Sequence, residues 1–431
     1  MRQKKFWFAL NGILALVALA VMWPMGAVAS SQYKVLHRFT GNDGANPYAG
    51  LIFDAGGSLY GTTAIGGKNN EGTVFKLTQN SDGTWKESVL HSFAGPPDGE
   101  NPYSGLIFGS DGSLYGTTAT GGQYGKGTVF KLTLTQHGTW KESVLHSFAG
   151  PPDGLDPDTA GVIFDPAGNL YGTTAYGGTT SDCGSLGCGV VFRLTPNTDG
   201  SWTENVLYNF CPATGCLDGA SPSAGVIFDL SGNLYGTTSV GGPSGAGIAF
   251  KLARSKRGWT ESVLYSFCSL KDCTDGSHPY AGLSSDLSGN LYGTTLFGGS
   301  PTCLNGGVCG VVFRLTPNSN GSWQESVLHR FQGHPAIGPN ASVILDKAGN
   351  LYGTTANEVN YIGEGTVFKL TPQSSHWKYR VLHLFKSEPT LNPYSNLLID
   401  NTGNLYGTAT SCACGKNRYG VVFQISQSPI R

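Results

Sequence analysis

Near-copies of Leu-Tyr-Gly-Thr-Thr recur seven times, and this repetition limits the fold more than any other feature of the sequence. They start at Leu59, Leu114, Leu170, Leu234, Leu291 and Leu351, and a seventh copy, Leu-Tyr-Gly-Thr-Ala, starts at Leu405. Successive tyrosines lie between 54 residues (Tyr352 to Tyr406) and 64 residues (Tyr171 to Tyr235) apart. This period is near the roughly 40–50 residues of propeller repeats and predicts a ring of similar units.

The second repeat shows what each unit contains. Gly105–Phe108 is a short apolar run, Leu114–Thr118 and Thr128–Leu132 are strand-like, and Trp140–Phe148 is a longer fourth segment. Glycine-containing turns separate these segments. The sequence therefore predicts an all-β fold, a seven-bladed β-propeller with four antiparallel strands in each blade.

The two ends of the chain predict how the ring closes. Residues 33–39 copy the fourth strand before any repeat has begun, whereas the last repeat stops after 420–425 without a fourth strand. The N-terminal strand is therefore expected to complete the last blade, which removes the exposed edges of the ring. Residues 30–431 then form a single domain. Its repeats cover approximately 50–93, 105–148, 161–210, 225–267, 282–331, 342–385 and 396–425, the last completed by 33–39.

A tight turn at Asp82-Gly83 predicts the register of the outer hairpin. If both residues form a two-residue turn with positive φ, Lys76 shares a sheet face with Glu87 and forms a cross-strand ion pair. The same reasoning pairs Lys131 with Glu142, Arg193 with Glu204 and Arg314 with Glu325.

Residues 1–29 indicate export. Three basic residues precede an apolar run from Phe6 to Met22, and Ala27-Val28-Ala29 fits a cleavage site, so we expect a signal peptide, with an uncleaved membrane anchor as the alternative. The rest of the chain carries 24 basic and 28 acidic residues. It has no basic footprint for nucleic acid. We expect an extracytoplasmic protein (secreted, periplasmic or at the cell surface), monomeric, with no membrane contact beyond this segment.

The pattern DxxGNLYGTT…GG…GxVFxLTP resembles the Gloeobacter/Verrucomicrobia (GloVer) tandem-repeat family of exported bacterial proteins. The resemblance covers residues 33–425. It implies export and a propeller-like fold, and it implies no catalytic residues.

Ten cysteines form five close pairs, and in an exported chain disulfides are the expected interpretation. The pairs are Cys183/Cys188, Cys211/Cys216, Cys268/Cys273, Cys303/Cys309 and Cys412/Cys414. Only one residue separates Cys412 from Cys414, and a bridge between them would be strained. A redox role for these two cysteines is therefore a further hypothesis, weaker than the two functional ones given below. A zinc site from the first four cysteines is the alternative for the third repeat. No metal or cofactor is assigned.

Histidines recur in the fourth strand, with tyrosine at two equivalent positions. They are His37, His91, His146, His329 and His383, with Tyr208 and Tyr265. Lying on separate blades, they cannot share one metal ion. Alternation places each on the sheet face of the preceding Val and following Phe, so we interpret them as packing between blades.

The loops leading into the blades carry the candidate binding residues. Aspartates and aromatic rings around one face suit sugars or, through the carboxylates, calcium; the alternative is that Asp-Gly and Pro only build the turns. The candidates are Asp43, Tyr48, Asp98, Tyr103, Asp275, His278 and Tyr280. With the long loops on this face, any site is expected here or at the central channel.

Blades six and seven depart from the repeat, and a unique active site would have to break the symmetry. Glu358 and Glu364 are candidate acid or base residues there, and Arg418 is a candidate for binding an anionic sugar. Atypical terminal repeats also serve stability alone. The sequence contains no nucleophile elbow, HExxH motif or phosphate loop. The favoured function is a non-catalytic exported protein that binds polysaccharide or cell-surface partners, or acts as a scaffold; the alternative is a lyase or hydrolase acting on carbohydrate.

Overall fold

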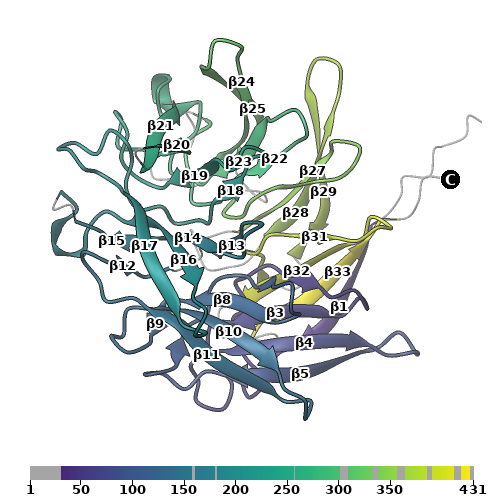
Figure 1. Ribbon diagram of the computed structural model, residues 1–431. Coiled ribbons are helices and arrows are strands. Elements are labelled where there is room, and N and C mark those ends of the chain that lie inside the picture. Colours follow the sequence, from purple (N-terminus) through teal and green to yellow (C-terminus); the bar gives the residue numbers. More distant parts are fainter. Residues whose placement is uncertain are drawn as a thin grey trace, which may run out of the picture.

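The computed structural model contains seven four-stranded antiparallel sheets arranged as blades of a ring (Figure 1). The structure describes residues 31–157, 161–179, 182–256, 258–300, 309–332, 338–356, 365–385, 391–411 and 419–427. The expected signal segment, residues 1–29, lies outside these ranges. The predicted fold, seven blades of four antiparallel strands, is confirmed.

The strands of the first six blades run outward from the central axis in chain order, and in the last blade the N-terminal strand is outermost. The innermost strands are β2 (Ile52–Phe53), β7 (Ile107–Phe108), β13 (Ile163–Phe164), β18 (Ile227–Phe228), β22 (Ser284–Ser285), β26 (Ile344–Leu345) and β31 (Leu398–Ile399). The second strands are β3 (Leu59–Thr63), β8 (Leu114–Thr118), β14 (Leu170–Thr174), β19 (Leu234–Thr238), β23 (Leu291–Thr295), β27 (Leu351–Thr355) and β32 (Leu405–Ser411). The third strands are β4 (Thr73–Gln79), β10 (Thr128–Leu134), β16 (Val190–Pro196), β20 (Ile248–Ser255), β24 (Val311–Pro317), β28 (Thr366–Pro372) and β33 (Val421–Ser426). The outermost strands are β5 (Trp85–Ser92), β11 (Trp140–Ser147), β17 (Trp202–Asn209), β21 (Gly258–Ser266), β25 (Trp323–Arg330), β29 (Trp377–Leu384) and β1 (Gln32–Arg38).

Short additional elements lie in the loops. Two-residue strand pairs join β6 (Gly99–Glu100) to β9 (Thr120–Gly121) and β12 (Gly154–Leu155) to β15 (Tyr176–Gly177), and β30 (Leu391–Asn392) pairs with β32. These pairs link the loop that leads into a blade, here called the connecting loop, to the loop between its second and third strands. Both loop types therefore share one face of the ring, the connecting-loop face. Two short 3-10 turns, η1 (Gly184–Leu186) and η2 (Lys271–Cys273), also lie in loops, and within the described ranges no helix is long and apolar enough to span a membrane.

The N-terminal strand closes the ring, as predicted. Strand β1 pairs antiparallel with β33, from Gln32 opposite Ser426 to Arg38 opposite Val421. Figure 1 shows β1 beside β33, between the last blade and the first. The last blade is therefore built from both ends of the chain.

The Leu-Tyr-Gly-Thr-Thr strand is buried throughout, and its glycine and threonine have separate roles. A Cβ on Gly61 would lie 2.7 Å from the ring of Phe75 on the neighbouring strand, so only glycine leaves room for that ring. Thr62 Oγ1 donates to the carbonyl oxygen of Ser104, 2.9 Å away in the next blade. Equivalent threonines make the same kind of bond in every blade: Thr117 to Pro157, Thr173 to Ala224, Thr237 to Ala281, Thr294 to Ala341, Thr354 to Ser395 and Thr408 to Ala49.

A collar of small residues surrounds the central axis, one from each blade just before its innermost strand. Its members are Gly50, Gly105, Gly161, Gly225, Gly282, Ser342 and Asn396. A Cβ on Gly225 would lie 2.9 Å from the carbonyl oxygen of Gly161, and one on Gly50 would lie 3.2 Å from that of Asn396. Neighbouring blades thus approach backbone to backbone, which requires small residues here.

The hydrophobic core is divided among the interfaces between blades. One cluster joins Val74 and Phe93 of the first blade to Leu106, Leu114 and Phe130 of the second. Each of the other clusters likewise spans two neighbouring blades. A blade therefore buries its apolar faces only against its neighbours.

The predicted register of the outer hairpins was wrong by one residue. Asn80 and Thr84 bond to each other through their backbones, which leaves a three-residue loop in which only Gly83 has positive φ. Lys76 consequently lies opposite Ser88, and Glu87 lies opposite Leu77 on the other sheet face. Lys76 pairs instead with Asp54 at 3.4 Å, and Lys131 pairs with Asp111 at 2.8 Å. The proposed pairs Arg193–Glu204 and Arg314–Glu325 fail for the same reason, since Arg193 faces Asn205 and Arg314 faces Ser326.

A β-bulge in the outermost strand corrects the predicted orientation of the histidines. His146 lies opposite Val129 and Val144 opposite Phe130, so Leu145 is the extra residue. Because Val129 and Phe130 face opposite sides of the sheet, His146 and Val144 also do. The same shift occurs in the other blades. The bulge turns each histidine away from the face of the preceding valine.

Candidate functional site

Tyrosines from three connecting loops meet beside the collar, at a place on the connecting-loop face that we call the mouth. The ring of Tyr48 lies 5.2 Å from that of Tyr103 and 5.6 Å from that of Tyr394, measured between centroids. Each tyrosine stands two residues before a collar residue, and each ring is partly exposed. We call Tyr48, Tyr103 and Tyr394 the mouth tyrosines. They present aromatic surface from the last, first and second blades at one place on the connecting-loop face.

The proline before each mouth tyrosine fixes its loop. Pro102 packs so closely on Gly72 of the preceding blade that a Cβ there would lie 2.5 Å from the proline ring. Pro47 packs in the same way on Gly420, and Pro393 on Gly365. The contact between each proline and the preceding blade therefore fixes the position of the following tyrosine relative to the collar.

The mouth is asymmetric. At the position of the mouth tyrosines, the fourth blade has Ser223, the fifth Tyr280 and the sixth Asn340; the third has Thr159, in a loop that is one residue longer, and Thr159 lies outside the described residues. Adjacent aromatic rings thus occur where the ends of the chain meet. Tyr280, a predicted binding residue, is partly exposed on the opposite part of the ring.

The predicted aspartates do not lie with the tyrosines. Asp43 accepts hydrogen bonds from His37 Nε2 at 3.0 Å and from Thr40, and Asp98 lies 3.0 Å from His91 Nε2. Burial opposes ionisation of Asp43, but these hydrogen bonds outweigh it and lower its pKa. Asp275 is completely buried and accepts bonds from Tyr265 and Ser269. These carboxylates tie the connecting loops to the outermost strands.

His278 lies deeper than the sequence suggested. Its ring packs edge-on against Phe297, with 5.3 Å between centroids. Burial lowers the pKa of the imidazole, and among the described residues Nδ1 has no hydrogen-bond partner.

A second repeated feature, which we call the rim contact, joins the outermost strands of neighbouring blades. In five of the seven, a histidine or tyrosine that is hydrogen-bonded to an aspartate of the following connecting loop faces a glutamate of the next blade. These groups are His37, Asp43 and Glu87; His91, Asp98 and Glu142; His146, Asp153 and Glu204; Tyr208, Asp218 and Glu261; and Tyr265, Asp275 and Glu325. Burial, together with the neighbouring aspartate, raises the pKa of each glutamate to about 7.

The other two rim contacts are aromatic. Tyr379 stacks on His329 and Tyr33 stacks on His383, at the two places where the connecting loop lacks the Asp-Gly pair. Sequence reasoning missed the rim contacts, although a signal existed. Where the aspartate is absent, the residue four positions before the next outer histidine is tyrosine and not glutamate.

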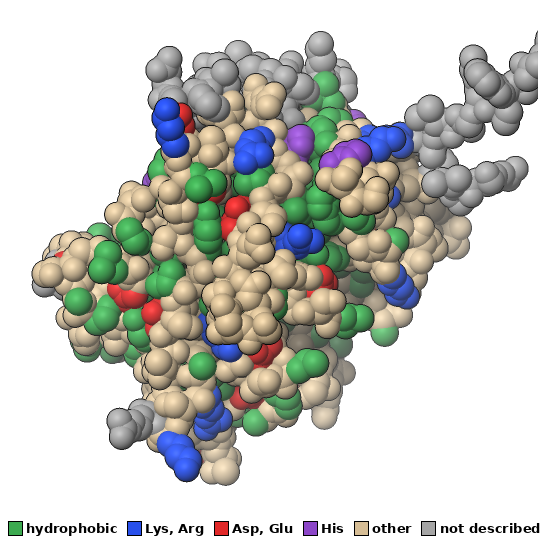
Figure 2. Space-filling view, turned by 90° about the horizontal axis from the view of Figure 1, so that it is seen from above, with side chains coloured by type: hydrophobic (Ala, Val, Ile, Leu, Met, Phe, Trp, Pro, Cys, Tyr) green, Lys and Arg blue, Asp and Glu red, His purple; other side chains and the backbone are tan. Residues whose placement is uncertain are grey.

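A groove of about 920 Å3 lies on the rim beside the contact that includes Asp98 and Glu142. Its walls include Asp98, Tyr124, Glu142, His146 and Asp153. Tyr124 is 52% exposed, but the two aspartates already accept backbone and histidine hydrogen bonds. At the edge of the ring seen in Figure 2, charged side chains of both signs are scattered among uncharged ones.

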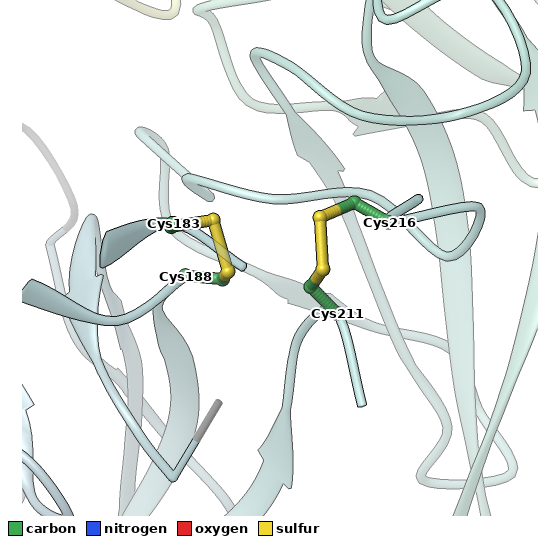
Figure 3. A group of neighbouring side chains, drawn as sticks. All are labelled: Cys183, Cys188, Cys211 and Cys216. Carbon is green, nitrogen blue, oxygen red and sulfur yellow. A yellow bond between two sulfur atoms is a disulfide. The ribbon is translucent and has the colours of Figure 1, made fainter. Parts of the chain in front are cut away.

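Three of the five predicted disulfides are present in the described residues. They are Cys183–Cys188, Cys211–Cys216 and Cys268–Cys273. The first two lie side by side (Figure 3). Disulfides of this number are typical of proteins in oxidising, extracytoplasmic compartments.

Only one of the two cysteines of the predicted Cys303–Cys309 bridge, Cys309, lies in the described residues. Cys309 is buried and disulfide-bonded, whereas its expected partner Cys303 lies outside the described residues. The pairing of these two cysteines therefore stays a prediction. Cys412 and Cys414 also lie outside the described residues, and so do the predicted catalytic candidates, Glu358, Glu364 and Arg418.

The closed ring of four-stranded blades defines a seven-bladed β-propeller. The sequence pattern of the Gloeobacter/Verrucomicrobia repeat matches residues 26–180, 81–303 and 301–429, and the chain belongs to this family. No curated protein matches the chain. Among solved structures it is similar to a Thermus thermophilus protein described as an oxidoreductase (glucose dehydrogenase), with 16% identity, a TM-score of 0.45, and coverage of 92% of this chain and 100% of that chain.

Proposed function

We propose that this propeller is an exported, non-catalytic binding protein that takes polysaccharide at the mouth tyrosines. The observation that carries the proposal is the contact of Tyr48 with both Tyr103 and Tyr394. Partly exposed aromatic rings bury the apolar face of a sugar ring at little entropic cost. The fourth and sixth blades have Ser223 and Asn340 at the equivalent positions, and polar side chains of this kind are partners for sugar hydroxyls.

The asymmetry of the mouth also supports a single binding position. Seven identical blades would offer a sugar seven equivalent positions, whereas adjacent rings from the last, first and second blades offer one extended aromatic surface. The mouth tyrosines carry no charge, which suits an uncharged or weakly charged chain of sugars.

The test is binding of the full chain to a glycan array, followed by affinity measurements with any soluble polysaccharide that binds. The variants Tyr48→Ala and Tyr394→Ala are expected to weaken binding by roughly 10-fold or more, because each removes one ring of the surface. Thermal unfolding of each variant checks that the fold is intact.

Tyr124→Ala is the matched control, because Tyr124 is an exposed tyrosine of the rim groove and not of the mouth. Loss of binding in Tyr124→Ala but not in Tyr48→Ala would move the site to the rim. Absence of binding to every glycan, together with no partner in pull-downs from a bacterial envelope, would overturn the proposal.

A further inference from the structure

We propose that the four cysteines of the third blade, Cys183, Cys188, Cys211 and Cys216, form a tetrathiolate zinc site when their two disulfides are reduced. The four Sγ atoms lie within 4.8 Å of one another. Figure 3 shows the two bridges side by side, reached from separate segments of chain. In the part of the chain that the structure describes, this is the only such group of cysteine, histidine or acidic residues.

The distances suit zinc. Structural zinc sites bind four thiolates tetrahedrally at about 2.3 Å, which places the sulfur atoms about 3.8 Å from one another. Sulfurs that already lie within 4.8 Å need only small side-chain rotations to reach that arrangement once the two S–S bonds are gone. Each pair has four residues between its cysteines, the upper end of the usual spacing for zinc ligands.

Contacts other than the two bridges also hold the four cysteine positions. Cys188 and Cys211 are completely buried in the core between the third and fourth blades. The backbone N–H of Gly215 donates to Asp182 Oδ2 at 3.0 Å, which ties one cysteine loop to the other. Backbone bonds from Ser221 to Cys188 and from Gly242 to Cys216 anchor each loop to its neighbours. Reduction therefore leaves a site whose ligands are already oriented.

Cys268 and Cys273 provide the contrast. They form the equivalent bridge one blade further on and lie beside no second described pair. A short cysteine loop therefore also occurs by itself, and among the described residues two such loops converge only at the third blade.

The two states exclude each other, and the chemistry balances. A phosphine or dithiol reductant supplies four electrons and, with four protons from solvent, converts the two disulfides to four thiols. Zinc then displaces four protons as it binds four thiolates. Oxidation back to two disulfides removes all four ligands and releases the ion. Zinc occupancy of this site therefore reports the thiol state of the blade.

The experiment uses the full chain, reduced with a phosphine under nitrogen and freed of metal. Co²⁺ is titrated first, since tetrahedral cobalt thiolate gives intense charge-transfer bands, and Zn²⁺ is then used to displace it. Native mass spectrometry counts the bound ions before and after reoxidation. We expect one high-affinity ion in the reduced chain and none in the oxidised chain.

The double variants C183S/C188S and C211S/C216S are expected to lose affinity by about 100-fold or more, since disturbing outer partners alone costs 10–100-fold. The variant C268S/C273S is the control and is expected to bind as the parent does. Equal binding by C183S/C188S and the parent, or no tetrahedral cobalt spectrum in the reduced parent, would overturn the proposal. If reduction unfolds the chain, zinc must restore the circular dichroism spectrum of the parent; failure to do so also overturns it.

Discussion

Tyr379 lies flat on the imidazole of His329, with 4.1 Å between ring centroids and 2° between ring planes. Tyr33 stacks on His383 in the same way, at 4.0 Å and 8°. Burial lowers the pKa of His329 to about 4, so the stacked ring is neutral near pH 7. At the other rim contacts an aspartate and a glutamate occupy this space. The ring therefore uses two solutions for the same interface, one carboxylate-based and one aromatic.

Tyr379→Ala is expected to destabilise the fold by about 2 kcal/mol, because it opens a cavity over His329 and beside Phe331 and Phe368. Chemical denaturation measures the change. Tyr379→Phe keeps the stacking and should cost much less, and Tyr124→Ala, at an exposed position, should stay within about 0.5 kcal/mol of the parent. Equal stability of Tyr379→Ala and the parent would show that the stack contributes nothing.

The five rim glutamates predict that stability falls as the pH rises from about 5 to 8. Their folded-state pKa is about 7, above the ordinary value of 4.5, so the folded chain retains protons that the unfolded chain has lost. Their contribution is complete below about pH 4.5 and is lost as the pH passes 7. Melting temperatures across this range test it. Converting all five to glutamine should flatten the profile, and a profile that keeps its slope in that variant would contradict the prediction.

Gly225→Ala is expected to destabilise the ring by about 1–3 kcal/mol, because its Cβ would lie 2.9 Å from the carbonyl oxygen of Gly161. Gly105 occupies the same collar position in the second blade, but a Cβ there would lie 3.7 Å from the nearest backbone oxygen. Gly105→Ala is thus the matched control and should be tolerated. Denaturation midpoints of the two variants should differ in this direction; the reverse order would contradict the close approach at Gly225.

Thr237→Val is expected to cost about 1–3 kcal/mol, since it removes the bond to the Ala281 carbonyl and leaves that buried oxygen unpaired. Thr237→Ser retains the hydroxyl and separates this effect from the loss of a methyl group. If both variants lose the same stability, the interblade hydrogen bond is not the cause.

The architecture was predictable because the same pattern of four strand-like segments recurs along the chain and indicates seven similar blades. Leu-Tyr-Gly-Thr-Thr marked each second strand, and the orphan strand before the first repeat, 33–39, identified how the ring closes. Both predictions, the number of blades and the closure of the ring, depend on the number and order of the repeats. An error of one residue in a strand boundary or a register does not change them.

Register and site geometry were less accessible. Asp82-Gly83 fits either a two-residue or a three-residue hairpin loop, and that single residue decides whether Glu87 faces Lys76 or the neighbouring blade. The bulge at Leu145 has no marker in the sequence comparable to a glycine or proline. Tyr394 was not among the predicted binding residues, because its loop lacks the Asp-Gly pair that drew attention to Tyr48 and Tyr103.

The pairing of β1 with β33 has a consequence for the order in which the chain can fold. Gln32 and its partner Ser426 lie near opposite ends of the sequence. Strand β1 therefore cannot pair until β33 has been synthesised. At roughly 5–20 residues per second, synthesis alone imposes a delay of about 20–80 s. Throughout that time the strand at 32–38 is an unpaired edge, able to complete the ring of another copy. The pairing of β1 with β33 closes the ring of one molecule, and the same pairing would allow two molecules to exchange their N-terminal strands.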